Sequence, residues 1–153
     1  MRLSNLPVPE QNLLGIAAGS LLHRAYPWRL PGPRYVHRTV GATIGAAGAA
    51  LVVRAWSAAE QVDLSRPERL VKFGPYAISR NPMYVGWALL HLGVGVAAGS
   101  AWVVATLPPA ASLVHRQVLR EERALAATFN EEFGRYRAAV PRYLPLRAAF
   151  RSR

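Results

Sequence analysis

A short stretch of the chain, residues 80–86, joins an arginine, a predicted helix start and a tyrosine. Asn81 is a preferred N-cap, and Pro82 suits the first helical position because its missing N–H would have no partner there. The free N–H groups and dipole of such a helix start bind anions, while the ring of Tyr84 can stack on a base or face a cation. The stretch suits ligand binding; the alternative is an interfacial aromatic belt beside a snorkelling Arg80.

A second group of polar residues occupies positions 115–122. His115 and Glu122 are seven residues apart and therefore share one face of a helix. A histidine at this place is a candidate general base, and the adjacent carboxylates Glu121 and Glu122 can face a cation. The alternative is a solvated helix face stabilised by i,i+4 pairs such as Gln117 with Glu121.

The composition excludes some kinds of chemistry and leaves others open. The 153 residues include no cysteine, which excludes disulfides, cysteine-ligated metals and a cysteine nucleophile. The net charge is +11, and Lys72 is the single lysine among 19 basic residues. Such a charge attracts nucleic acid, anionic lipid or acidic ligands. Because the arginines border apolar runs and no nucleic-acid motif occurs, we favour membrane lipids as partners and expect neither nucleic acid nor a metal.

Long apolar runs alternate with charged segments, which is typical of a membrane protein. A membrane span takes about 20 apolar residues. We therefore expect a single domain over residues 1–153 with spans near 11–26, 38–57, 82–98 and 101–119. The first of these is short, so it either crosses with snorkelling ends or lies at the interface. In the second, Gly41 and Gly45 form a small-xxx-small pair, which lets helices approach closely in lipid.

The last two predicted spans form a hairpin. Residues 84–114 would make a helix of roughly 46 Å, too long for one crossing of a hydrocarbon core about 30 Å thick. Gly99 and Ser100 provide a turn near the middle of the run, and Pro108 and Pro109 are expected to kink the second helix.

The hairpin also predicts the orientation in the membrane. It brings residues 80 and 121 to the same side, and nine arginines between residues 116 and 153 mark that side as cytoplasmic. The segment 27–38 then lies outside, although the positive-inside rule disfavours its arginines there.

The ordered motifs of residues 70–145 resemble those of a known family. They read Arg-Asn-Pro-Met-Tyr-Val-Gly at 80–86, Glu-Glu-Arg-Ala-Leu at 121–125, Phe-Asn-Glu-Glu-Phe-Gly-Arg-Tyr at 129–136 and Val-Pro-Arg at 140–142. The set is similar to that of isoprenylcysteine carboxyl methyltransferases and phospholipid methyltransferases. Three residues depart from the family pattern: Asn81 stands where many members have His, Asn130 where Gly is usual, and Phe133 where Tyr is frequent.

The resemblance implies an all-α integral membrane enzyme that uses S-adenosylmethionine. Its fold would be a helical bundle of about four transmembrane helices with the hairpin and a cytoplasmic C-terminal helix. The cofactor-binding residues implied are Gln61, Glu68, Arg69, Leu70, Val71, Tyr76, Asn81, Pro82, Met83, Tyr84, Glu121 and Glu122. The helix start at Pro82 suits the carboxylate of the cofactor, Glu121 its ammonium, and the tyrosines its adenine or sulfonium.

The implied reaction transfers a methyl group to a lipophilic acceptor that enters from the bilayer. Arg116 or Arg120 would position an acidic headgroup or carboxylate, and His115 would act as general base. These three are the expected catalytic residues, in a multi-pass protein of the bacterial cytoplasmic membrane whose site faces the cytoplasm. The alternative is a non-catalytic membrane scaffold that keeps the same fold.

The apolar run of residues 84–114 generates the first testable prediction. Because this run is too long for one helix of a small soluble domain, we expect the chain to stay in the pellet when membranes are extracted with alkaline carbonate. Immunoblotting of pellet and supernatant measures this, and release into the supernatant would contradict integral insertion.

Overall fold

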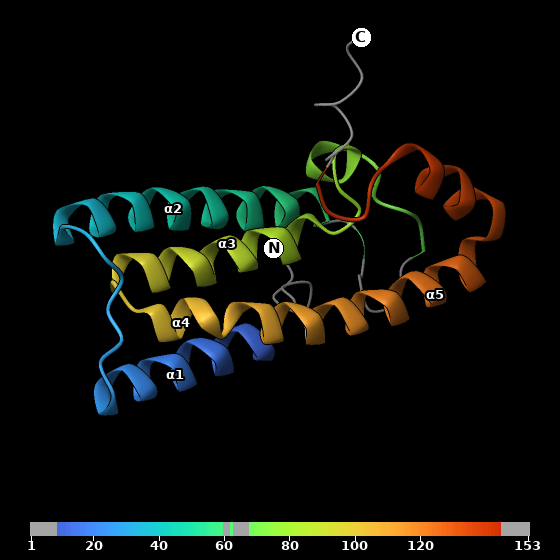
Figure 1. The fold of residues 1–153 in the computed structure, drawn as a ribbon. Coiled ribbons are helices and arrows are strands. Elements are labelled where there is room, and N and C mark those ends of the chain that lie inside the picture. Colours follow the sequence, from blue (N-terminus) through green and yellow to red (C-terminus); the bar gives the residue numbers. More distant parts are fainter. Residues whose placement is uncertain (1–8, 60–61, 63–67, 145–153) are drawn as a thin grey trace, which may run out of the picture.

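The computed structural model describes residues 9–59, 62 and 68–144, and this part of the chain is helical, with no β-strand (Figure 1). Figure 1 shows the helices lying side by side in an elongated bundle, from which the far end of α5 extends. The elements are α1 (Glu10–Ala25), α2 (Arg34–Ala58), the 3-10 helix η2 (Gly74–Ala77), α3 (Pro82–Ala97), α4 (Ala101–Ala105) and α5 (Leu107–Ala139). The all-α prediction is confirmed.

Glycines facing one another bring α2 and α3 together. A Cβ added to Gly48 would stand 2.7 Å from the backbone oxygen of Gly86, and one added to Gly93 would stand 2.6 Å from the backbone nitrogen of Gly45. A Cβ on Gly41 would collide with the backbone of Ala97. The helices therefore touch backbone to backbone, as the small-residue pattern predicted, but a Cβ on Gly45 itself would meet nothing within 4 Å.

The expected turn joins α3 to α4. Gly99 adopts a φ of +60°, which glycine tolerates without steric cost, and the Ser100 hydroxyl accepts a hydrogen bond of 3.3 Å from the backbone N–H of Val103. Pro108 lies in the first turn of α5. The expected proline-induced disruption of this helix is present: the helix is interrupted at Thr106, directly before the prolines, which then stand in the first turn of α5.

A buried histidine ties α1 to this hairpin. His91 is 0% exposed; its Nδ1 lies 3.1 Å from Oδ1 of Asn12 and its Nε2 lies 3.0 Å from the backbone oxygen of Val103. Polar groups inside an apolar bundle are costly unless they are hydrogen-bonded. The contact therefore fixes α1 against α3 and α4, beside Gly15, where an added Cβ would stand 2.8 Å from the His91 ring.

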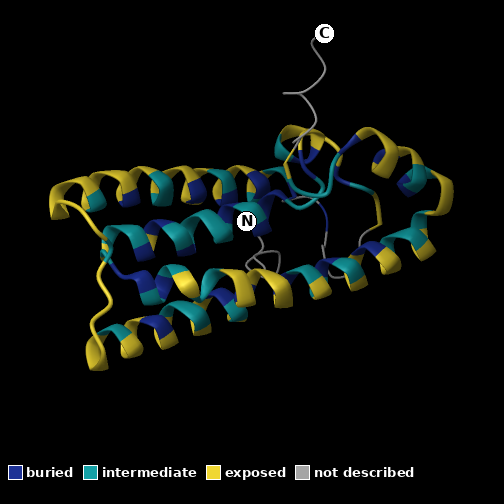
Figure 2. Ribbon diagram, viewed as in Figure 1, coloured by how far each residue is buried: buried dark blue, intermediate teal, exposed yellow. Residues whose placement is uncertain are grey.

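The helix lengths bear on the predicted spans. Within the described residues, α2 is the helix long and apolar enough to cross a membrane, and it starts at Arg34, four residues before the predicted span. α3 is apolar but has 16 residues, as does α1. Large apolar side chains nevertheless point outward on α1 and α2, where Leu14 is 68% and Val53 is 51% exposed, and Figure 2 shows both helices exposed along their outer faces.

The glycine contacts predict that Gly41→Ala and Gly45→Ala have opposite effects. The first puts a methyl group into the backbone of α3, and overpacking costs about 1–3 kcal/mol. The second fills open space and adds helix propensity worth up to about 1 kcal/mol. Thermal unfolding in detergent should show a lower midpoint for Gly41→Ala and an unchanged or higher one for Gly45→Ala. Equal midpoints would show that the helices do not approach as described.

Candidate active site

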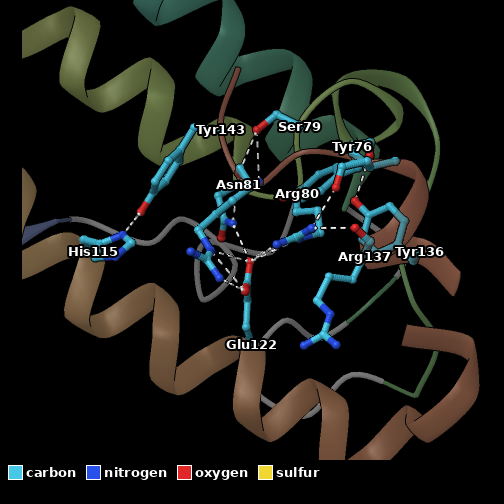
Figure 3. A network of polar contacts seen from close by, with 11 residues as sticks. Tyr76, Ser79, Arg80, Asn81, His115, Glu122, Tyr136, Arg137 and Tyr143 are labelled. Atoms are coloured by element: carbon cyan, nitrogen blue, oxygen red, sulfur yellow. Dashed lines mark hydrogen bonds and ion pairs between the residues drawn. The ribbon is translucent and has the colours of Figure 1, made fainter. Parts of the chain in front are cut away.

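The Glu122 carboxylate on α5 is held between two arginines (Figure 3). Arg80 donates from Nη2 to Glu122 Oε1 at 2.9 Å, and Arg142 donates from Nη2 to Oε2 at 2.9 Å. The Glu122 side chain is 10% exposed and that of Arg80 is 7% exposed, so this ion pair is largely shielded from water. Both carboxylate oxygens are engaged. We call these three residues the Glu122 clamp.

The clamp joins segments that lie far apart in the sequence. Arg80 stands just before α3, Glu122 lies in the middle of α5, and Arg142 follows α5. The guanidinium of Arg80 also donates to the backbone oxygen of Val140 at 2.7 Å, and its own backbone N–H donates to Pro141 at 2.9 Å. The segment after α5 is therefore fastened across the start of α3.

A break in α5 makes this return possible. Asn130 interrupts the helix with φ 42° and ψ −114°, so the last turns of α5 fold back towards the start of α3, as Figure 1 shows. Positive φ favours glycine, and asparagine is among the side chains that tolerate it best. Asn130, at the position where glycine is usual in the resembled family, is therefore compatible with this bend.

A second, more open group lies beside the clamp. The Tyr84 hydroxyl donates to Glu121 Oε1 at 2.7 Å, and Nε2 of Gln117 lies 3.0 Å from both of these oxygens. Gln117 and Glu121 are the i,i+4 pair expected from the sequence. Tyr84 is buried, whereas Glu121 is exposed, and no described group donates to its Oε2. Glu121 therefore offers an oriented carboxylate oxygen to a cationic ligand.

The start of α3 lies next to that carboxylate. Asn81 occupies the N-cap position as predicted, but its side chain does not cap the helix. Its amide donates to the backbone oxygen of Arg142 at 3.2 Å and lies 3.4 Å from Glu122 Oε1. No described group accepts from the backbone N–H of Met83 or Tyr84. The helix start thus keeps free donors with which an anion can be bound.

The charges follow from these contacts. Burial by itself would raise the pKa of the Glu122 carboxyl, but hydrogen bonds and charge from Arg142 and Arg80 outweigh it, and the pKa lies below its usual value. Burial raises the pKa of Tyr136 to about 12, and it also raises that of Tyr76. Tyr136 donates its hydroxyl to the backbone oxygen of Tyr76 at 2.7 Å. Glu122 is therefore ionised and both tyrosines are neutral at pH 7.

The three expected catalytic residues, His115, Arg116 and Arg120, do not all lie on the side of α5 that faces the candidate site. Nδ1 of His115 lies 2.8 Å from the Tyr143 hydroxyl, on the same side of α5 as the clamp. Arg116 and Arg120 are exposed, and the helical period puts them on the other side of α5 from Glu122. The structure brings His115 towards the candidate site and does not bring the two arginines there.

The other predicted cofactor residues divide between packing and surface positions. Val71, Tyr76 and Met83 are buried in one apolar cluster, and Leu70 packs against a second one around Phe133. The remaining predictions are Pro82, which is buried, Glu68 and Arg69, which are exposed, and Gln61, which lies outside the described residues.

Residue-by-residue reasoning missed the partners that organise the site. Arg142 and Tyr143 were not expected there, and neither was a contact of Gln117 with Tyr84. The signal available in the sequence was the position of Arg142 at the end of the Val-Pro-Arg motif, together with Arg80 at the start of the first motif.

Comparison with known proteins identifies a family that matches most of the described chain. The family model described as phospholipid methyltransferase matches residues 36–132. The cobalt-zinc-cadmium resistance protein CzcN of Cupriavidus metallidurans is 36% identical over 112 residues, which are 71% of this chain and 51% of that protein. The nickel-cobalt-cadmium resistance protein NccN of Alcaligenes xylosoxydans xylosoxydans is 32% identical over 112 residues, which are 72% of this chain and 52% of that protein. The chain thus spans about half the length of these curated relatives.

The names of these relatives refer to metals. In residues 9–59, 62 and 68–144, no group of three or more His, Asp or Glu side chains is placed to hold a metal ion.

The clamp predicts that Glu122→Gln is far more destabilising than Glu132→Gln. Removing the Glu122 charge leaves the shielded Arg80 uncompensated, at a cost of about 3 kcal/mol, and also takes away the partner of Arg142, whose side chain is 34% exposed. Glu132 pairs with Lys72 at 2.7 Å, but both side chains are more than 40% exposed, so its loss costs about 0–1 kcal/mol. The midpoints of thermal unfolding in detergent at pH 7 measure this, and the midpoint of Glu122→Gln should lie well below that of Glu132→Gln.

The pH dependence of the same variants provides the check. Because the folded pKa of Glu122 lies below its unfolded value, its stabilisation is complete at neutral pH and is lost as the pH falls through the folded pKa. The gap between wild type and Glu122→Gln should therefore close in acid. A gap that is the same at all pH values would contradict an ionised Glu122.

Proposed function

Because this chain belongs to the phospholipid methyltransferase family, we propose that it is an S-adenosylmethionine-dependent methyltransferase acting on a lipophilic acceptor in the membrane. The observation that carries the proposal is the carboxylate of Glu121, oriented by Tyr84 and Gln117 beside a helix start with free N–H groups. An α-amino acid carries an ammonium and a carboxylate a few bonds apart. The Glu121 carboxylate suits the ammonium, and the free N–H groups of the helix start suit the carboxylate.

The residues fit the cofactor by the chemistry of their donors and acceptors. In the proposal, Oε2 of Glu121 accepts from the ammonium, and the N–H groups of Met83 and Tyr84 donate to the carboxylate. The Tyr84 ring lies beside both and suits a sulfonium or adenine. S-adenosylmethionine, when bound, supplies an electrophilic methyl group. Alignment of the acceptor with that methyl accounts for most of the catalysis, because a direct displacement depends on geometry.

We assign Glu122 and Asn81 a positioning role within this site. Both oxygens of Glu122 are taken by Arg80 and Arg142, so its neighbour Glu121 is the carboxylate left for the ligand. The side-chain NH2 group of Asn81 donates to Glu122 and to the backbone oxygen of Arg142, and the side chain does not cap α3. The N–H groups at the helix start therefore stay free.

The other implied cofactor residues form the surroundings of the site in this proposal. The buried side chains of Val71, Tyr76 and Met83 support its walls. Glu68 and Arg69 belong to the connection between α2 and η2 and are proposed to cover the site from that side, whereas Gln61, outside the described residues, stays a predicted cofactor residue.

We further propose that the chain crosses the membrane several times, with the site on the cytoplasmic side. The outward Leu14 on α1, Val53 on α2 and Leu113 on α5 are each at least 50% exposed, which suits contact with lipid. α1 and α3, with 16 residues each, would span with snorkelling ends. The acceptor then enters from the bilayer between α3 and α5.

His115 is proposed as the base for an acceptor that loses a proton on methylation. Its Nδ1 is engaged with the Tyr143 hydroxyl, which fixes the ring, and no described group occupies its Nε2. Arg116 and Arg120, on the exposed side of α5, are proposed to hold acidic headgroups at the membrane surface next to the site.

Cofactor affinity tests this assignment. In the proposal, Glu121→Gln removes one hydrogen bond between a carboxylate and the charged ammonium of the cofactor, worth about 1.5–3 kcal/mol, and 1.4 kcal/mol is a factor of ten in affinity. We therefore expect a loss of about tenfold or more in affinity for S-adenosylmethionine, measured by calorimetry in detergent, with an unchanged thermal midpoint. Glu132→Gln, in an exposed ion pair, is the control and should bind as the wild type does.

Two outcomes would count against the proposal. Small and equal effects at Glu121 and Glu132 would make Glu121 a solvated surface residue. A wild-type protein that binds no S-adenosylmethionine at all would favour the non-catalytic scaffold.

A further inference from the structure

A basic pocket lies at the end of the bundle opposite the Glu122 clamp. Its volume is about 350 Å³, and its basic lining residues are His23, Arg29, Arg34, His37 and Arg38. They come from the end of α1, the connection to α2 and the first turns of α2, and they face the turn at Gly99. Figure 1 shows both connections, α1 to α2 and α3 to α4, at this end, while the start of α3 and the far part of α5 lie at the other.

The positive charges of this pocket are not neutralised within the described chain. The guanidinium groups of Arg29, Arg34 and Arg38 make no ion pair with any described residue, in contrast to those of the Glu122 clamp. The sequence has no Asp or Glu from residue 11 to 59 or from 69 to 120, and these stretches contain every segment that lines the pocket. Like charges held close together repel one another, so the arrangement favours an anion.

Two further groups in the pocket lack a counterpart. Nδ1 of His23 is buried and has no hydrogen-bond partner, which is rare for a buried polar atom. α2 begins at Arg34 with no side-chain cap and no acidic residue in its first turn. The free Nδ1 of His23 and the uncapped start of α2 thus lie in the same pocket as the arginines.

The rim of the pocket is built by specific contacts. Leu30 donates its backbone N–H to Gly99, and Ala101 donates to Trp28, each at 2.9 Å. The rings of Trp28 and Trp102 pack edge to face with centroids 5.1 Å apart, and Trp102 Nε1 donates to the backbone oxygen of Tyr26 at 2.7 Å. These bonds hold the two connections together, so the arginines stand on a fixed framework.

We propose that this pocket binds a phosphate group, carried either by an anionic lipid headgroup or by free phosphate. Guanidinium groups bind phosphate through paired hydrogen bonds, and a volume of about 350 Å³ lies in the range of small-ligand sites. The half-exposed Trp28 and the exposed Tyr26 beside it suit the interface level of a bilayer. A bound anion would also account for three arginines on the side where the positive-inside rule disfavours them. The site is separate from Glu121 and does not depend on the methyl transfer.

The test measures binding of a fluorescent short-chain phosphatidylglycerol to the full chain in zwitterionic detergent. The pocket variant is Arg29→Gln, Arg34→Gln and Arg38→Gln together. The control variant, Arg54→Gln with Arg123→Gln and Arg135→Gln, removes the same charge from exposed positions outside the pocket. We expect the pocket variant to bind at least about tenfold more weakly, as loss of charged hydrogen bonds requires, and the control to change little.

Competition by inorganic phosphate distinguishes the two sources. Displacement of the lipid by phosphate at comparable concentration identifies a free phosphate site, whereas failure to displace it identifies a headgroup site. Equal affinity in the pocket and control variants, or no binding of either probe to the wild type, would overturn the proposal. The double variant Arg34→Gln with Arg38→Gln should give an intermediate loss. An unchanged midpoint of thermal unfolding in detergent would show that the fold of the pocket variant is intact.

Discussion

The ionised Glu122 between Arg80 and Arg142 is the interaction on which the rest of the site depends. Burying an isolated carboxylate costs free energy. The ion pairs with Arg80 and Arg142 offset that cost, and removing Glu122 would leave the arginines without a counter-charge. The three residues come from separate segments, so the ion pairs determine how α3, α5 and the returning chain lie together. They also distinguish the two adjacent carboxylates: both oxygens of Glu122 are bonded to arginines, and Glu121 is the carboxylate that we propose for ligand binding.

The apolar bundle supplies the frame for this polar end. In the membrane setting that we propose, the hydrophobic effect contributes little to helix association, so close backbone contact and buried hydrogen bonds would hold the helices together. Gly48 and Gly86 permit such contact between α2 and α3, and His91 with Asn12 fixes α1 by hydrogen bonds. With the frame fixed on both sides, the start of α3 keeps its place opposite α5.

Local signals made much of this predictable from the sequence. The helix start at Pro82 and the turn at Gly99 each follow from residue types within a few positions, whereas the all-α fold was expected from the long apolar runs and from the family resemblance. The hydrogen bonds of Asn81 were not predicted, because its amide donates to Arg142 and Glu122, which are distant in sequence. Arg142 itself reaches the site only because α5 bends at Asn130. Such contacts depend on the fold, which no local pattern contains.

The most direct test of the account is an experimental structure of the chain with S-adenosylhomocysteine bound. The account predicts that the ammonium of this ligand lies within hydrogen-bonding distance of Glu121 and its carboxylate near the N–H groups of Met83 and Tyr84. It also predicts that Arg80 and Arg142 remain on Glu122. A ligand bound elsewhere, or one that takes Glu122 from its arginines, would contradict it.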